Sequence, residues 1–465
     1  MKIPAEKITL EQWEERYKDL CTQGMKDPSY GGPLGRHVKH GDLRIQSLKF
    51  DNSPAALDLW NFLLTEEERL HQDISKGYKL VGTMKDLGTI PVMAYSLPNV
   101  KAFYPDGAWW IPCIMELSAG LLEIADKLGV NDSFCPVRAM LGAFMNKKHF
   151  PIPDLLICSA GATCDDFSAI AQRVEYMGHP IFWWEIPARR DPEPDESSVM
   201  LPGGFVAPAL QISLVKKEME RIREVLEHLA DTKLDDIKLA QGIRKANQIR
   251  RLLRDLRHLV YKADLCPLPA LEMQIAEMLA IHFCSDQGET LRIYRDLVRE
   301  VKRRIKAGEG ILGREAIKIY WINPVADIKV MNILEECGGR LCGTEFLFCH
   351  ALDEIPENIP PLEALSRMAL ADPMAGPTRD RAERICQDIR EFGAEAVVIS
   401  RIPGASHCAF EGHLIKKKVL EKFEIPVTEI EVPPLCDSFQ TALQTRIEAL
   451  VESVKTNRRT FRDPL

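Results

Sequence analysis

Apolar positions along the chain fall into two alternating patterns, short continuous runs and longer stretches at helical spacing. The run Ile317–Ile322 (IKIYWI) is rich in β-branched and aromatic residues and is typical of a buried strand. From about Leu210 to Ala307 the apolar residues recur at helical spacing, with almost no proline. Strand-like runs stand on both sides of this stretch. The alternation predicts an α/β fold that is interrupted by a helical insertion.

An internal likeness relates residues 155–187 to residues 397–433. Each segment reads as an apolar strand, a small-residue loop, a cysteine, an amphipathic helix and a second strand that ends in Glu-x-Pro. Cys164 and Cys408 occupy the same place, in the loop between the strand and the helix. Open α/β sheets bind ligands at the carboxyl ends of their strands. We therefore expect two α/β lobes, each with one cysteine at this edge.

The predicted fold is α/β, with two Rossmann-like, doubly wound lobes, an N-terminal helical region and a helical insertion. The expected divisions are a helical region at 1–85, a first lobe at 86–205, an insertion at 206–308, and a second lobe with a C-terminal helix at 309–465. That last helix has one apolar face, which is expected to pack against the second lobe. The face consists of Leu443, Ile447, Leu450, Val451 and Val454.

Charge and composition exclude several classes of protein. The 465-residue chain has a formal net charge of −8 and no long basic stretch, which argues against nucleic acid as a partner. The charged, amphipathic N-terminus is unlike a signal peptide, and no apolar run is long enough to cross a bilayer. We expect a cytoplasmic protein with no membrane partner. Its 13 cysteines should then be reduced thiols or metal ligands rather than disulfides.

Three cysteines share a context that suits metal ligands. Cys135 precedes a proline, Cys164 precedes two aspartates, and Cys408 precedes another amphipathic helix, so each is expected at a helix start. The free amides and the dipole of a helix N-terminus lower a thiol pKa and favour the thiolate. Three thiolates from separate elements could hold an iron–sulfur cluster. Spacing alone leaves the alternative open, because a buried, inert thiol explains each of them singly.

The remaining candidates carry weaker signals. His407 could orient a substrate or donate a proton, or it could be a solvated loop residue. Ser159 and Thr163 could hydrogen-bond a cluster sulfide or a substrate oxygen, or they could cap the helix. His407 and Ser159 are therefore the catalytic candidates. No P-loop motif is present, which predicts no ATP site on this chain. Gly308–Gly313 (GEGILG) matches a dinucleotide motif by letter but lies between a helix and a strand in the wrong order, so no NAD site is expected. Other cysteines are expected in ordinary packing, or too dispersed for joint ligation: Cys21, Cys266, Cys284, Cys386, and Cys337, Cys342 and Cys349.

Three segments in order resemble the 2-hydroxyacyl-CoA dehydratase and benzoyl-CoA reductase family. FCPVRAMLGAF resembles the family's cysteine-proline segment, and ATCDDFSAIA resembles its threonine-cysteine-aspartate segment. ASHCAFEGHLIKKKVLEKFEIPVTEIEV resembles its C-terminal cysteine segment, and the TRIEALVESV helix also fits. The resemblance covers roughly residues 90–455 and is closer to the larger dehydratase subunit.

The resemblance implies an oxygen-sensitive iron–sulfur enzyme. Family members pair two homologous subunits, each able to hold a four-iron four-sulfur cluster through three cysteines. By position these ligands are Cys135, Cys164 and Cys408 here. A separate ATP-hydrolysing iron–sulfur activator supplies one low-potential electron. In an (R)-2-hydroxyacyl-CoA dehydratase, a ketyl radical then forms on the acyl-CoA and the hydroxyl leaves as water.

Alternatives within the resemblance stay open at this point. The chain could be a subunit of an ATP-dependent benzoyl-CoA (aryl-CoA) reductase, a homodimeric double-cubane cluster reductase, or a scaffold subunit without catalysis. Two departures from the family pattern bear on the ligand set. No cysteine occurs near IPVMAYSLPNV or WINPVAD, where the family often has one, and Cys113 is displaced from the first of these places.

Overall fold

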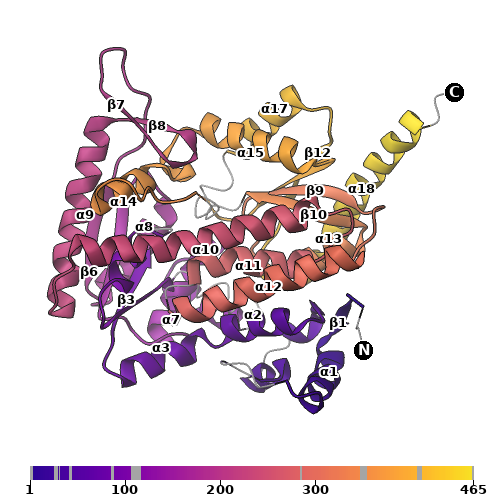
Figure 1. The fold of residues 1–465 in the computed structure, drawn as a ribbon, viewed down its shortest axis with the longest axis horizontal. Helices are drawn as coiled ribbons and strands as arrows, with labels where there is room; N and C mark the ends of the chain where they lie inside the picture. The colour runs from indigo at the N-terminus through magenta and orange to yellow at the C-terminus, as the bar shows by residue number, and fades with distance from the viewer. Residues whose placement is uncertain are drawn as a thin grey trace.

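The computed structural model describes residues 4–25, 30, 32–40, 44–84, 88–105, 117–282, 285–345, 353–405 and 411–462. Two four-stranded parallel sheets form its framework, with helices around and between them (Figure 1). Two short antiparallel pairs, β1 with β2 and β7 with β8, lie outside these sheets. The predicted α/β class with two doubly wound lobes is confirmed.

The first sheet has the strand order β4-β3-β5-β6. Its strands are β3 (Lys79–Met84), β4 (Val100–Phe103), β5 (Leu155–Gly161) and β6 (Ile181–Ile186). One face packs against α6 (Leu117–Lys127), α7 (Ala139–Asn146) and α8 (Asp165–Tyr176). The other face packs against α4 (Ile90–Tyr95) and α9 (Ala209–Ala230). The winding direction reverses between β3 and β5, so the carboxyl ends of these two strands form the place where such sheets bind ligands.

The second sheet repeats this winding, with the order β10-β9-β11-β12. Its strands are β9 (Ile317–Ile322), β10 (Gly339–Glu345), β11 (Ala396–Arg401) and β12 (Val427–Glu431). One face packs against α15 (Thr378–Phe392) and α17 (Gly412–Lys422). The other face packs against α13 (Lys329–Glu336) and α18 (Gln440–Arg462). The two halves of the molecule are therefore built to one plan.

The internal likeness is confirmed in three dimensions. Its first copy folds as β5, α8 and β6, and its second copy folds as β11, α17 and β12. The sheet register aligns the copies, because Ala160 lies opposite Glu185 and Arg401 lies opposite Glu431. By the same register, Ser159 and Ser400 hold equivalent positions.

Long helices connect the two sheets. They are α10 (Asp236–Lys262), α11 (Ala270–His282) and α12 (Gln287–Ala307). In Figure 1, α10 crosses the molecule, and it contacts α4 beside the first sheet and β10 in the second. The predicted helical insertion is thus the bridge that fixes one sheet against the other. A further helix, α14 (Pro361–Leu370), packs against α9 and α10.

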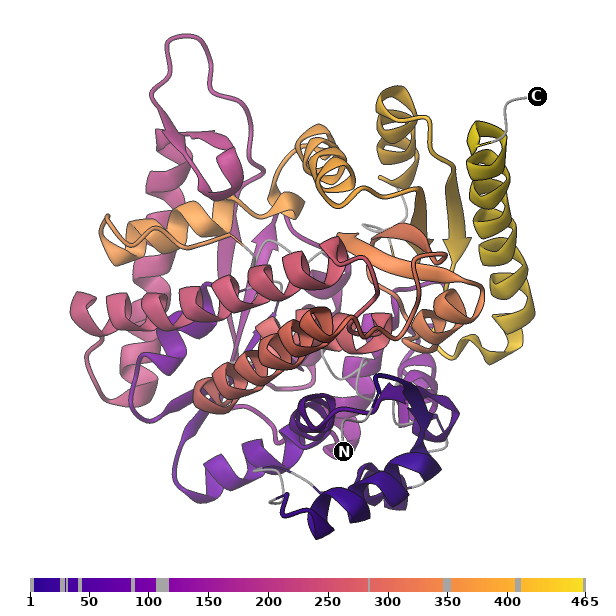
Figure 2. The same ribbon diagram turned by 45° about the vertical axis from the view of Figure 1, so that its right-hand side comes forward.

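The N-terminal segment packs against this bridge. It contains β1 (Lys7–Thr9), α1 (Leu10–Thr22), β2 (Lys49–Asp51), α2 (Pro54–Leu64) and α3 (Glu66–Ser75). Helix α2 contacts both α11 and α12. At the other end of the chain, α18 lies along the outer side of the second sheet beside β12 (Figure 2). The predicted apolar face of α18 is buried there.

The start of the first sheet differs from the sequence-based expectation. Strand β3 lies within the region expected to be helical, so the first sheet begins before residue 86. Gly82 and Thr83 interrupt its apolar run, which hid the strand in the sequence. A hairpin of β7 (Ser198–Met200) and β8 (Val206–Pro208) joins the first sheet to α9.

Candidate functional site

Cys135 stands at the start of a helical segment, as Pro136 predicts. It is the N-cap residue of the short 3₁₀ helix η4 (Pro136–Arg138), which continues into α7. The side chain is partly buried. Arg138 donates from Nη1 to the carbonyl oxygen of Phe134 at 3.0 Å, which closes the turn around Cys135. The local fold therefore holds this thiol at a fixed place between α6 and α7.

Cys164 also stands at a helix start, after the carboxyl end of β5. It is the N-cap residue of α8, and Asp165 and Asp166 occupy the first turn, where acidic side chains are favoured. The thiol is buried and lies 3.9 Å from Oδ2 of Asp166. Just before it, the hydroxyls of Ser159 and Thr163 lie 3.0 Å apart and are buried. The predicted capping context of Cys164 is observed.

The second lobe reaches Cys135 through two loops. Ala326 follows β9, while Ile402 and Ala405 follow β11, and these three buried residues form one apolar cluster that packs against Cys135. In the same contact, Gly404 (φ 76°) approaches the backbone of Phe134 so closely that a Cβ there would lie 2.5 Å from the carbonyl oxygen. Only a glycine allows this approach. The candidate site is therefore at the junction of the lobes.

The structure brings the elements next to two predicted ligands into contact and leaves the third ligand outside its description. Helix α8, which begins after Cys164, contacts η4, which begins after Cys135. His407 and Cys408 lie outside the described residues, and the chain that leads to them passes beside Cys135 at Ile402–Ala405. Within the described ranges, which omit 406–410, no three His, Cys, Asp or Glu side chains are grouped to hold a metal ion. The ligand set stays a prediction.

Several other cysteines are poor metal ligands by their surroundings. Burial raises the pKa of Cys266 and Cys337 to about 11 and that of Cys342 to about 12. Burial also raises the pKa of Cys386 and Cys436. These thiols remain protonated near neutral pH, whereas metal ligation needs the thiolate. Cys337 ends α13 and Cys342 lies within β10, which agrees with the expectation that they are separate packing residues.

A buried arginine, which sequence reasoning missed, lies at the carboxyl edge of the second sheet. Arg381 donates from Nε and Nη2 to the two carboxylate oxygens of Glu345, at 2.8 and 2.7 Å. Its Nη2 also donates to Oδ1 of Asn323, and its Nη1 donates to Glu411. Thr378 completes the group by donating to the other oxygen of Glu411 at 2.7 Å. Strand ends from β9 and β10 and the start of α17 are thereby tied to one guanidinium.

A surface groove of about 610 Å³ opens beside the Cys135 segment. Its lining comes from the loop at 128–134, which includes Phe134, and from α8, which includes Ile170. The exposed Tyr176 is also part of the lining. The groove gives a small molecule access to the chain next to Cys135, while Cys164 stays buried.

A family model matches most of the chain. The model of a family described as HGD-D, "2-hydroxyglutaryl-CoA dehydratase, D-component", matches residues 102–454. This range includes both sheets apart from β3 and the first two residues of β4, and it includes all three predicted cysteines. No curated protein matches the chain. No helix in the described parts of the chain is both long enough and apolar enough to span a membrane.

Proposed function

Because the chain belongs to the 2-hydroxyglutaryl-CoA dehydratase D-component family, we propose that it is the iron–sulfur subunit of an activator-dependent (R)-2-hydroxyacyl-CoA dehydratase. The family description supports a component of a dehydratase that acts on acyl-CoA. The finer proposal is that Cys135, Cys164 and Cys408 hold a four-iron four-sulfur cluster. Its partners would be a homologous second subunit, an ATP-hydrolysing iron–sulfur activator and the acyl-CoA substrate.

The observation that carries this proposal is the contact between Cys135 and the loops of the opposite lobe. Ala326, Ile402 and Ala405 pack on Cys135 from loops of the second lobe, and α8, whose N-cap residue is Cys164, contacts η4. The elements that carry two of the predicted ligands are therefore in contact near the junction of the lobes. Thiolates from separate elements suit a cluster that leaves one iron open to a substrate oxygen.

The residues around the described thiols fit a cluster of this kind. Cys135 and Cys164 each stand at a helix N-cap, where unpaired backbone N–H groups stabilise negative charge. The surroundings are apolar on the side of Ala326 and Ile402, which restricts access of water. A bound cluster would supply one-electron transfer at low potential. Burial and hydrogen bonds to its sulfurs would tune that potential.

The reaction itself removes water with no net change in oxidation state. One electron added to the thioester carbonyl gives a ketyl radical anion, and the hydroxyl on the neighbouring carbon then leaves. A proton lost from the next carbon and return of the electron complete the 2-enoyl-CoA product. The protein must therefore hold the carbonyl oxygen close to the electron source and keep bulk water away from the radical.

Serine variants of the three cysteines test the proposal. C135S, C164S and C408S should each lower iron and acid-labile sulfide per chain after anaerobic purification and should abolish dehydration of a 2-hydroxyacyl-CoA in the presence of the activator. C342S is the matched control, because Cys342 is buried in β10 and should leave the iron content unchanged. Full iron and full activity in all three variants would overturn the ligand set.

The same preparations separate the other members of the family. Reduction of benzoyl-CoA without dehydration would assign ring reduction, and about twice the iron of a single-cluster subunit would indicate a double cubane. A folded chain that stays free of iron would assign a supporting role to this subunit.

A further inference from the structure

Arg381 gathers its bonds from three separate places in the second lobe. Asn323 follows β9, Glu345 ends β10, and Glu411 precedes α17. Arg381 itself is fully buried in the first turn of α15. All three nitrogens of its guanidinium donate to side-chain oxygens, in four hydrogen bonds from its five N–H groups. A lysine could not reproduce this set, because it offers a single charged nitrogen on a flexible chain.

Asn323, one of these partners, begins the loop after β9 that reaches Cys135. Asn323 adopts a left-handed conformation (φ 71°), and three residues later Ala326 packs on Cys135. Asparagine tolerates this conformation better than most residues, but it still needs support from its surroundings. That support comes from Arg381 and from the bond that Asn323 Nδ2 donates to the carbonyl of Ser400 at 2.9 Å.

Glu411, another partner of Arg381, follows Cys408 in the sequence. Glu411 stands three positions after Cys408, and both of its carboxylate oxygens accept bonds, from Arg381 and from Thr378. Before Cys408, Gly404 is held against Phe134. Gly404 and Glu411, two described residues that precede and follow Cys408 in the sequence, are thus held by the opposite lobe and by Arg381, respectively.

We propose that Arg381 is a positioning residue for the metal site, which sets the place of the β9 loop and of the start of α17 relative to Cys135. This inference rests on the proposed function, since it concerns how the cluster ligands are held. Arg381 acts through Asn323 and Glu411 rather than by touching the cluster. Residues that bond directly to metal ligands typically change metal affinity about ten- to a hundredfold when they are replaced. We expect an effect in this range for Arg381, because it holds two segments that lie next to predicted ligands in contact or in sequence.

Arg340 provides a matched control in the same sheet. It is fully buried like Arg381, but it lies at the amino end of β10, where it donates to the carbonyls of Val260, Ala263 and Asp264. Strand β10 runs from Gly339 to Glu345, so the two arginines act at opposite ends of one strand. Replacing Arg340 removes a buried arginine from the lobe without touching its carboxyl edge.

The experiment uses the full chain, purified without oxygen and reconstituted with ferrous iron and sulfide. R381Q is expected to bind iron about ten- to a hundredfold more weakly than wild type and to change the electron paramagnetic resonance spectrum of the reduced protein. R340Q should lower the unfolding temperature while it keeps the wild-type iron content and spectrum. E411Q removes only the charge of a half-buried partner, folds without leaving a buried charge unpaired, and should shift the spectrum in the same direction as R381Q.

The outcomes are separable. A wild-type spectrum and iron affinity in both folded R381Q and folded E411Q would overturn the positioning role and leave the proposed function standing. Equal iron loss in R340Q and R381Q would also overturn it, because loss of stability would then explain both. A wild-type chain that takes up no iron would overturn the proposed function itself, and this inference with it.

Discussion

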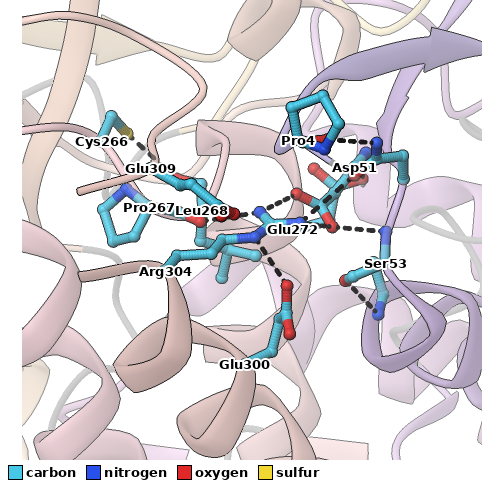
Figure 3. A network of polar contacts seen from close by, with 12 residues as sticks. Pro4, Asp51, Ser53, Cys266, Pro267, Leu268, Glu272, Glu300, Arg304 and Glu309 are labelled. Carbon is cyan, nitrogen blue, oxygen red and sulfur yellow. Dashed lines mark hydrogen bonds and ion pairs between the residues drawn. The ribbon is translucent and has the colours of Figure 1, made fainter. Parts of the chain in front are cut away.

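Two buried arginines, Arg304 and Arg381, make nearly the same bonds in different parts of the molecule. Arg304 binds both carboxylate oxygens of Asp51, at 2.5 and 3.0 Å, and also Glu300 and the carbonyl of Pro267 (Figure 3). Arg381 binds Glu345 in the same two-pronged way. Both side chains are 1% exposed. Pairing and burial alone do not distinguish them.

The difference lies in what their partners connect. Arg304 ties β2 of the N-terminal segment to α12 and to the chain before α11, so its partners lead only into packed core. Arg381 connects β10, the loop after β9 and the start of α17 at the carboxyl edge of the second sheet. The loop after β9 leads to the contacts of Cys135. The comparison teaches that a buried ion pair gains a functional role from its position in the fold. Loss of Arg304 should therefore affect stability alone.

The largest expected effect comes from breaking the core pair. R304M leaves Asp51 buried without its partner and should lower the free energy of unfolding by about 3–5 kcal/mol, measured by urea denaturation. Iron bound per folded chain should not change. R314A, at an exposed pair with Asp264, is the control and should cost less than about 1 kcal/mol. A small loss in R304M would show that the core tolerates the unpaired carboxylate.

The lobe contact can be tested with two glycines of similar backbone conformation. Gly404 (φ 76°) and Gly393 (φ 65°) would both be strained by a side chain, but only at Gly404 does the new Cβ meet another backbone, that of Phe134. G404A should destabilise the protein by about 1–3 kcal/mol more than G393A, which is the usual cost of overpacking. G404A alone should also lower bound iron. Equal effects would mean that the lobes separate easily.

The Arg304 region should also respond to pH. Burial and the nearby Asp51 carboxylate raise the pKa of Glu272 to about 8, and its Oε2 has no hydrogen-bond partner among the residues that the structure describes. Glu272 is therefore protonated in the folded protein near neutral pH but ionised in the unfolded chain. Its contribution to stability is complete at acid pH and is lost as the pH rises through about 8.

E272Q should remove this dependence. From this one proton, the wild-type free energy of unfolding should fall with rising pH by up to about 1.4 kcal/mol per pH unit. The E272Q variant should lack this part of the slope. Thermal unfolding measured from acid to alkaline pH checks this. E336Q, at an exposed pair with Lys49, should keep the wild-type slope. An unchanged slope in E272Q would assign the pH response to another group.

The smallest expected effect is at Ser159. S159A removes a buried hydroxyl that is bonded to Thr163 and should cost about 1 kcal/mol, with iron content and dehydration rate unchanged. Thermal unfolding and the dehydration assay check this. A rate that falls more than tenfold with iron intact would instead make Ser159 a catalytic residue.

Local patterns in the sequence were sufficient for most of the framework. The repeated strand, cysteine and helix units predicted both lobes, because buried parallel strands read as continuous apolar runs. Pro136 and the pair Asp165-Asp166 predicted the helix starts after Cys135 and Cys164. Strand β3 was missed because Gly82 and Thr83 weaken its pattern. Each of these outcomes depends on residues that are neighbours in sequence.

The junction of the lobes could not be predicted in the same way. Ala326 and Ile402 are ordinary apolar residues in loops, and nothing in their neighbourhood points to Cys135. Arg381 lies in a highly charged segment, TRDRAER, which is typical of an exposed helix. Its place four residues before the buried Ile385 was the one available signal that it faces inward. Tertiary packing decides both features.

The N-terminal segment has a consequence for how the chain is made. Lys7 binds Glu335 at 2.7 Å across a separation of 328 residues, so the ribosome must deliver most of the chain before this bond can form. At ordinary rates of synthesis that interval is roughly 15–65 seconds. The first sheet, assembled from 79–186, can close during this time while the segment before it still awaits its partners. Newly made protein should therefore pass through a stage at which β1 still lacks its contact with Glu335 and is accessible to chaperones.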